Sequence, residues 1–208
     1  MSNTPSSASS RRRGSPPLSS RVAKAFGFAL MAHGAQTRKG TTIPYISHVM
    51  AVASIVLDYG GSEDQVVAAL LHDTVEDCGV TYLQLERQFG ARVARIVKDC
   101  TDAETFPKPP WRTRKQHYID HLRSGHNSSS LLVSAADKLH NARAIVNDVK
   151  HYGKSVWKRF HASPGEILWY YQSLITIFRR RAGEVSPAFH LLVQELADTV
   201  KEMKRLAA

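Results

Sequence analysis

The stretch Leu70-Leu71-His72-Asp73-Thr74-Val75-Glu76-Asp77 carries most of the information in this chain. It sets an adjacent His-Asp pair one helical turn before an adjacent Glu-Asp pair, so in a helix each member of the first pair lies over one of the second. The apolar run 66–71 comes directly before them and indicates a buried helix, in which acidic groups require partners or a cation. The stretch therefore predicts the centre of a metal-dependent hydrolytic site.

The rest of the chain has the periodicity of helices. Ser62 with Gln65 forms a capping box that opens the helix carrying the His-Asp pair, and Thr81 with Gln84 opens another. Further helices are expected over residues 21–33, 46–58, 91–100, 112–124, 131–149, 164–181 and 187–206. The sequence contains no convincing period-2 strand, internal repeat or Gly-rich phosphate loop. We therefore expect an all-α helical bundle of about eight to ten helices.

Composition predicts one domain behind a short tail. With 208 residues and 43% hydrophobic side chains, the chain can bury a sizeable core. Residues 1–20 are rich in Ser, Pro and Arg and are predicted to be a disordered basic tail, which leaves residues 21–208 for the domain. The tail could touch RNA or membrane phosphates, although a tail that is only solvated needs no partner.

Charge and targeting signals restrict the partners and the compartment. The formal net charge is +10, of which residues 21–208 carry +7, so a polyanion such as a phosphorylated nucleotide or nucleic acid is favoured. No apolar run approaches the roughly 20 residues that span a bilayer, and no secretory signal is evident. Cys78 and Cys100 form neither a disulfide framework nor a C-x-x-C zinc motif. We expect a cytoplasmic protein with no membrane partner.

Two further residues complete a candidate ligand set. His48 lies on the helix expected over 46–58, among apolar residues. Asp137 stands in the otherwise apolar helical stretch Ser134-Ala135-Ala136-Asp137. Two imidazoles and two carboxylates without sulfur suit manganese, iron or zinc.

These motifs carry a family resemblance. The set His48, His72-Asp73 and Asp137 resembles the H…HD…D pattern of the HD-domain metal-dependent phosphohydrolases. The segments Arg38-Lys39-Gly40, Pro44–His48, LLHDTVED and Ala136–Asn141 further resemble the hydrolase domain of RelA/SpoT enzymes and the single-domain small alarmone hydrolases. The likeness runs from about Arg21 to Tyr171, and the isolated hydrolase is the better match.

The resemblance implies an activity and a role for each matched residue. The family removes pyrophosphate from the 3′ position of guanosine tetra- or pentaphosphate and leaves GDP or GTP. Carried over to this sequence, the ligands of one manganese ion are His48, His72, Asp73 and Asp137. Glu76 and Asp77 match the pair that orients and deprotonates the attacking water. The matched substrate contacts are Arg38 on the purine face, Lys39 on a phosphate, Asn141 near the nucleoside and, where the alignment is loose, Tyr170.

Simpler interpretations stand beside these assignments. A lone histidine or aspartate in an apolar helix is usually a satisfied core residue, and this suffices for His140. The Glu76-Asp77 pair could be a solvated helix end, and Arg38-Lys39 a solvated loop. The aromatic residues of the C-terminal half are more typical of core than of cofactor contacts.

Three functions are therefore weighed. The leading hypothesis is a manganese-dependent guanosine alarmone 3′-pyrophosphohydrolase. The first alternative keeps the site but acts on adenosine alarmones or another nucleotide polyphosphate. The second is a non-catalytic HD module that binds alarmone or nucleic acid, against which the intact Glu76-Asp77 pair argues. The native metal, the purine preference, the oligomeric state and any regulators stay open at this point.

Overall fold

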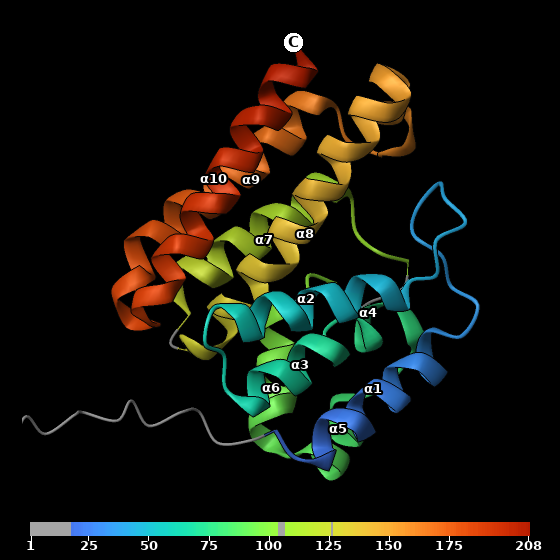
Figure 1. Cartoon of the computed structure of the whole chain (residues 1–208), viewed down its shortest axis with the longest axis vertical. Coiled ribbons are helices and arrows are strands. Elements are labelled where there is room, and N and C mark those ends of the chain that lie inside the picture. The colour runs from blue at the N-terminus through green and yellow to red at the C-terminus, as the bar shows by residue number, and fades with distance from the viewer. Residues whose placement is uncertain (1–17, 104–106, 126) are drawn as a thin grey trace, which may run out of the picture.

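The computed structural model describes residues 18–103, 107–125 and 127–208, and within these ranges the chain is a bundle of α-helices (Figure 1). The α-helices are α1 Ser20–His33, α2 Ile46–Asp58, α3 Glu63–Leu71, α4 Thr74–Cys78, α5 Tyr82–Phe89, α6 Ala91–Cys100, α7 Trp111–Ser124, α8 Ser129–Tyr152, α9 Pro164–Arg181 and α10 Pro187–Ala207. Two 3₁₀ segments, Gly153–Arg159 and Ala182–Glu184, flank α9. The only bridge of β type among the described residues pairs Thr37 with Pro44. The predicted all-α architecture is confirmed.

Several helix ends follow directly from the sequence. Ser62 N donates to Gln65 Oε1 at 2.9 Å, and Thr81 N donates to Gln84 Oε1 at 2.8 Å, so both predicted capping boxes form. A third, Ser163 with Glu166, opens α9 in front of Pro164. Each box satisfies amide groups that would otherwise lack a partner at a helix start.

The helix expected to carry the His-Asp pair is interrupted, which differs from the prediction of one continuous helix end. Helix α3 ends at Leu71, and α4 begins at Thr74. His72 Nδ1 lies 2.7 Å from Ala69 O, and Thr74 Oγ1 donates to Leu71 O at 2.7 Å. These side chains take carbonyl groups that a continuing helix would use, so the helix stops. Asp73 and Asp77 are still one helical turn apart, because Asp77 N donates to Asp73 O at 2.9 Å.

The core lies where α2, α3, α6 and α8 meet. The run 66–71 of α3 is buried throughout, as are most residues of 130–137 on α8. Helix α8 extends beyond this core to pack against α10 and the 3₁₀ segment that follows it (Figure 1). Among the described elements, α8 thus packs both against α2, α3 and α6 and against α10.

Little of the N-terminal tail belongs to the part of the chain that the structure describes. Residues 1–17 of the tail predicted over 1–20 lie outside the described residues. Ser19 caps α1, and Ser20 is its first residue, so the helix starts slightly earlier than the sequence indicated. No helix in the described ranges is both long and apolar enough to cross a membrane.

Candidate functional site

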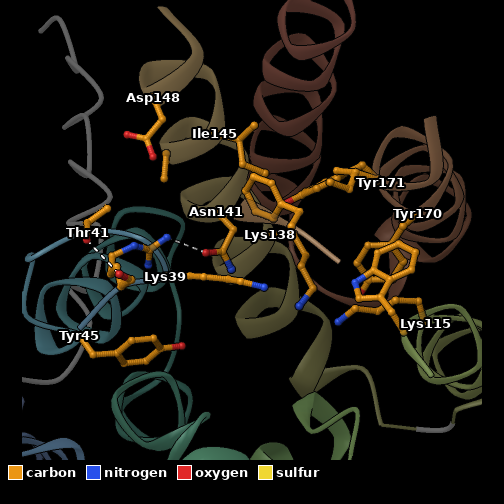
Figure 2. Close-up of a pocket in the computed structure, with 15 residues that line it drawn as sticks. Lys39, Thr41, Tyr45, Lys115, Lys138, Asn141, Ile145, Asp148, Tyr170 and Tyr171 are labelled. Carbon is orange, nitrogen blue, oxygen red and sulfur yellow. Dashed lines mark hydrogen bonds between the residues drawn. The ribbon is translucent and has the colours of Figure 1, made fainter. Parts of the chain in front are cut away.

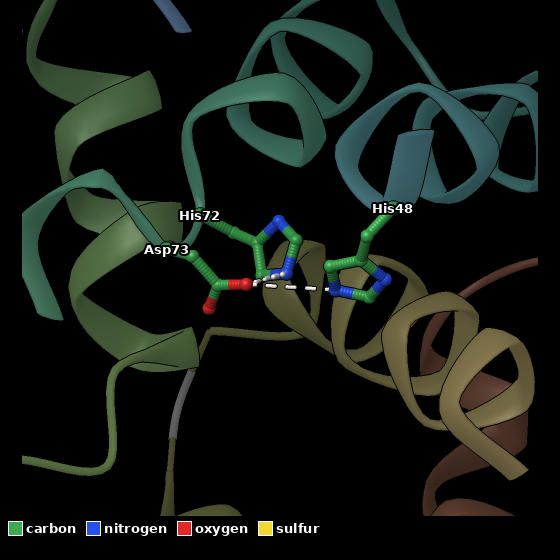
Figure 3. A group of neighbouring side chains, drawn as sticks. All are labelled: His48, His72 and Asp73. Carbon is green, nitrogen blue, oxygen red and sulfur yellow. Dashed lines mark ion pairs between the residues drawn. The ribbon is translucent and has the colours of Figure 1, made fainter. Parts of the chain in front are cut away.

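The residues predicted as ligands come from three elements and converge in the interior. His48 projects from α2, His72 and Asp73 from the turn between α3 and α4, and Asp137 from α8. One ligand atom from each of His48, His72 and Asp73 lies within 4.8 Å of the other two (Figure 3). Asp137 Oδ1 joins them, 3.2 Å from His48 Nε2 and 3.8 Å from His72 Nε2. Nε2 of each histidine thus lies within 4 Å of one oxygen of Asp73 and of one oxygen of Asp137.

Both histidines direct Nε2 to the carboxylates of this cluster. Because a carbonyl only accepts, His72 Nδ1 donates its proton to Ala69 O and turns Nε2 toward Asp73 Oδ2, 3.0 Å away. That buried Nε2 has no hydrogen-bond partner among the described residues. His48 Nδ1 lies 2.8 Å from His140 Nδ1. Burial, helped by His48 and Arg38, lowers the pKa of His140 to about 4, and the two rings share this hydrogen bond.

The carboxylates are held ionised by their neighbours. Burial alone would raise the pKa of Asp137, but Lys138 and the two imidazoles outweigh it and hold that pKa well below its usual range. Lys138 Nζ and Asn141 Nδ2 each donate to Asp137 at 2.5 Å. Asp73 Oδ2 accepts a hydrogen bond of 2.5 Å from Tyr45. Two imidazoles and two oriented carboxylates fit a divalent transition metal, with outer hydrogen bonds that fix the ligands.

Glu76 and Asp77 lie on α4, one helical turn after the His72-Asp73 pair. Lys108 Nζ donates to Glu76 Oε1 at 2.8 Å and to Asp77 Oδ1 at 3.0 Å. Burial and the nearby Asp102 raise the pKa of Glu76, while Lys108 works against them. A carboxylate with a raised pKa is a better proton acceptor near neutral pH.

A cavity of about 280 Å³ adjoins the cluster (Figure 2). It is lined by Arg38, Lys39, Thr41, Tyr45, Trp111, Lys115, Lys138, Asn141, Ala144, Ile145, Asp148, Phe160, Ile167, Tyr170 and Tyr171. Its lining thus combines basic groups with aromatic surface, which suits a ligand that carries both phosphates and a ring.

The cavity and the ligand cluster share hydrogen bonds. Tyr45 bonds Asp73, while Lys138 and Asn141 bond Asp137, and all three donors line the cavity. Arg38 Nη2 donates to Asn141 Oδ1 at 2.9 Å. A molecule in the cavity therefore lies beside the candidate metal ligands.

All the residues predicted for the site lie in this region, and several neighbours were missed. Arg38, Lys39, Asn141 and Tyr170 line the cavity as the sequence indicated. Their roles are not tested by the geometry and stay predictions. The missed residues are Tyr45, Lys108, Lys115, Lys138, His140 and Asp148. Spacing could have found Asp148, because it follows Asp137 by three helical turns.

Comparison with protein-family models identifies this architecture. The HD domain model matches residues 25–167, which is more than half of the chain. The chain belongs to the HD-domain family. The match contains every ligand of the candidate metal cluster, and the predicted family resemblance is confirmed.

Several curated relatives of this HD domain are known hydrolases by name. The guanosine-3′,5′-bis(diphosphate) 3′-pyrophosphohydrolase MESH1 of Xenopus tropicalis is 39% identical over 127 residues, covering 60% of this chain and 69% of the relative. The human MESH1 is 42% identical over 127 residues, covering 59% and 68%. The guanosine-3′,5′-bis(diphosphate) 3′-pyrophosphohydrolase of Aquifex aeolicus is 31% identical over 130 residues, covering 62% of this chain but 18% of that longer protein.

Solved structures share the fold. The crystal structure of lmo0812 from Listeria monocytogenes EGD-e superposes with a TM-score of 0.65 at 34% identity, covering 74% of this chain and 96% of that one. A metazoan ortholog of SpoT that hydrolyses ppGpp superposes with a TM-score of 0.69, covering 89% and 97%. Its identity is 23%, so it supports the HD-domain fold alone.

The ligand assignment makes a direct prediction about metal content. His72→Ala or Asp137→Ala should remove the bound ion, because each leaves the cluster one ligand short and one buried charge poorly compensated. Metal analysis of the purified variants by mass spectrometry checks this, with the exposed His190→Ala as the matched control. Chelation should also lower the melting temperature of the wild-type protein and leave that of Asp137→Ala unchanged. Full metal content in Asp137→Ala would contradict the assignment.

Proposed function

We propose that this chain is a metal-dependent hydrolase that removes pyrophosphate from the 3′ position of guanosine tetra- or pentaphosphate, releasing GDP or GTP. One observation carries the proposal: the residues that bond the candidate ligand carboxylates also line a basic, aromatic cavity. The names of the MESH1 relatives, 39% to 42% identical, support the same substrate.

The charge of the cavity supports a substrate with several phosphates. Lys39, Lys115 and Lys138 line it together with Arg38. Lys138 is engaged by Asp137, and Lys115 is paired with Asp102. Lys39 has no ion-pair partner among the described residues, so it is free to meet a phosphate group.

The chemistry follows from the positions of the side chains. A divalent cation, when bound by the four ligands, polarises a phosphoryl oxygen and makes water more acidic. Glu76 accepts the proton of the attacking water, and Asp77 orients that water. The water oxygen bonds to the phosphorus on the ribose 3′ oxygen, that P–O bond breaks, and the leaving 3′ oxygen takes the proton that Glu76 accepted. Lys108 holds both carboxylates in place.

The identity of the metal is part of the proposal. A set of two imidazoles and two carboxylates suits manganese, which is the family expectation, and also admits iron or zinc. We propose one manganese ion in each chain. The cytoplasmic location expected from the sequence stays a prediction.

Product analysis tests the reaction. Metal-stripped protein should regain activity when manganese is added, and it should convert guanosine tetraphosphate to GDP plus pyrophosphate in equal amounts. Adenosine alarmones, assayed in parallel, test the alternative substrate. Release of single phosphates, or cleavage at the 5′ end, would contradict the proposed reaction. Binding of alarmone without any turnover would favour the non-catalytic module.

Substitution of Glu76 and Asp77 distinguishes substrate binding from the chemical step. Replacing Glu76 by Gln and Asp77 by Asn should retain the metal and most substrate affinity but reduce kcat by about 10²–10⁴, the usual contribution of acid–base catalysis. Single-turnover kinetics and metal analysis of the double variant check this. An unchanged kcat would show that the pair is only a solvated helix end.

A further prediction concerns the contact between Arg38 and the purine. Stacking of a guanidinium on a ring contributes roughly 0.5–2 kcal/mol and tolerates a change of base. Arg38→Ala should therefore raise KM for guanosine and adenosine alarmones by similar factors and leave the cleavage position unchanged. Steady-state kinetics with both substrates measure this. A rise in KM for one purine alone would assign base selection to Arg38.

A further inference from the structure

A single carboxylate interrupts the basic lining of the cavity. Among the described residues that line it, Asp148 is the only acidic one, beside four cationic side chains. In Figure 2, it lies apart from the ammonium groups of Lys39 and Lys138, with Asn141 between. A carboxylate in contact with phosphates would repel them, so this end of the cavity must face another part of the ligand.

The position of Asp148 along α8 indicates which part of the ligand faces it. Asp137, Asn141, Ala144 and Asp148 follow one face of α8, since their spacing is that of successive helical turns. Asp137 belongs to the candidate metal cluster, and Asp148 stands three turns away, roughly 16 Å along the axis. With the 3′ phosphates beside Asp137, the nucleoside extends along this face, and the small side chain of Ala144 leaves room for a ring. The base then lies at the Asp148 end.

Asp148 pairs with one cation and keeps part of its carboxylate free to accept hydrogen bonds. Arg159 Nη1 donates to Asp148 Oδ2 at 2.9 Å. The side chain of Asp148 keeps 32% of its surface exposed, and no hydrogen bond occupies Oδ1 among the described residues. A carboxylate is acceptor-only and has sites for about four hydrogen bonds, so both oxygens can accept from a ligand.

We propose that Asp148 selects guanine over adenine by accepting hydrogen bonds from N1–H and the 2-amino group of the base. This inference rests on the proposed function and specifies its substrate. Guanine presents two adjacent donors on that edge. Adenine presents the unprotonated N1 instead, whose lone pair faces the carboxylate and leaves it without a donor.

Arg159 supplies the contact that positions Asp148. Its stem packs against Gly40, where an added Cβ would lie 2.8 Å from Arg159 Cδ, and Gly40 has a φ of +71°. Gly40 directly follows Arg38 and Lys39. The loop that carries the predicted purine-stacking residue and the residue predicted to read the purine edge are therefore joined through one side chain.

The decisive experiment compares two purines in matched variants. Asp148→Asn keeps the shape of the side chain but adds a donor, which can pair with N1 of adenine. It should lower the ratio of kcat/KM for guanosine over adenosine tetraphosphate by about 10- to 100-fold, the range expected when one or two hydrogen bonds to a base are lost. Asp148→Ala should lower the ratio in the same direction. Melting temperatures and metal content confirm that each variant is folded and loaded.

Arg159→Met is the control for a purely structural role. It removes the ion pair but keeps an apolar stem against Gly40, so KM should rise for both purines and the ratio should stay. If Asp148 only anchors Arg159, then Asp148→Asn and Arg159→Met will behave alike, with an unchanged ratio, and the inference is wrong. A wild-type protein that hydrolyses no alarmone would instead refute the proposed function itself.

Discussion

The structure depends on the mutual pairing of four polar groups, three of them buried and Asp73 partly buried. His48, His72, Asp73 and Asp137 stand where an apolar core would otherwise continue, and none is stable there alone. Each is oriented from behind: the histidines through Ala69 O and His140, the aspartates through Tyr45, Lys138 and Asn141. Nε2 of each histidine and one oxygen of each aspartate lie close together, an arrangement that suits a divalent cation.

Helix α8 transmits this arrangement to the substrate cavity. It crosses from the core formed with α2 and α3 to the packing against α10. Its buried face contributes to the core, and the adjacent face carries Asp137, Asn141 and Asp148 in sequence. A rigid helix thereby fixes the separation between the hydrolytic centre and the base end of the cavity. Positions on a helix are held more accurately than positions on a loop.

Much of this could be predicted from the sequence, for identifiable reasons. The helices are local features, set by periodicity and by capping residues such as Ser62 and Thr81, and their bounds agree closely. The ligand set emerged because four chemically unusual residues occur in apolar surroundings and in the order of a known family. Metal-bound roles for these residues stay predictions, as do those of Glu76 and Asp77.

What the sequence did not reveal depends on contacts between distant elements. Lys108 and Asp102 approach Glu76 only through the fold, and no local pattern indicates this. His140 was interpreted as a residue that only supports its helix, whereas its ring shares a hydrogen bond with His48, 92 positions away in the sequence. The break after Leu71 was missed because helix propensity does not register a side chain that captures a backbone carbonyl.

Because α3 ends at this break, His72 has two structural roles. The ring that offers Nε2 to the candidate metal also uses Nδ1–H to terminate α3, so one side chain sets both the ligand sphere and the direction in which α4 departs. Aspartate or cysteine could supply a ligand atom here but not the opposing donor. Only histidine has a donor and a lone pair on opposite sides of one rigid ring. The identity of this residue is therefore constrained by backbone geometry as well as by coordination chemistry, even in a descendant that had lost its catalytic role.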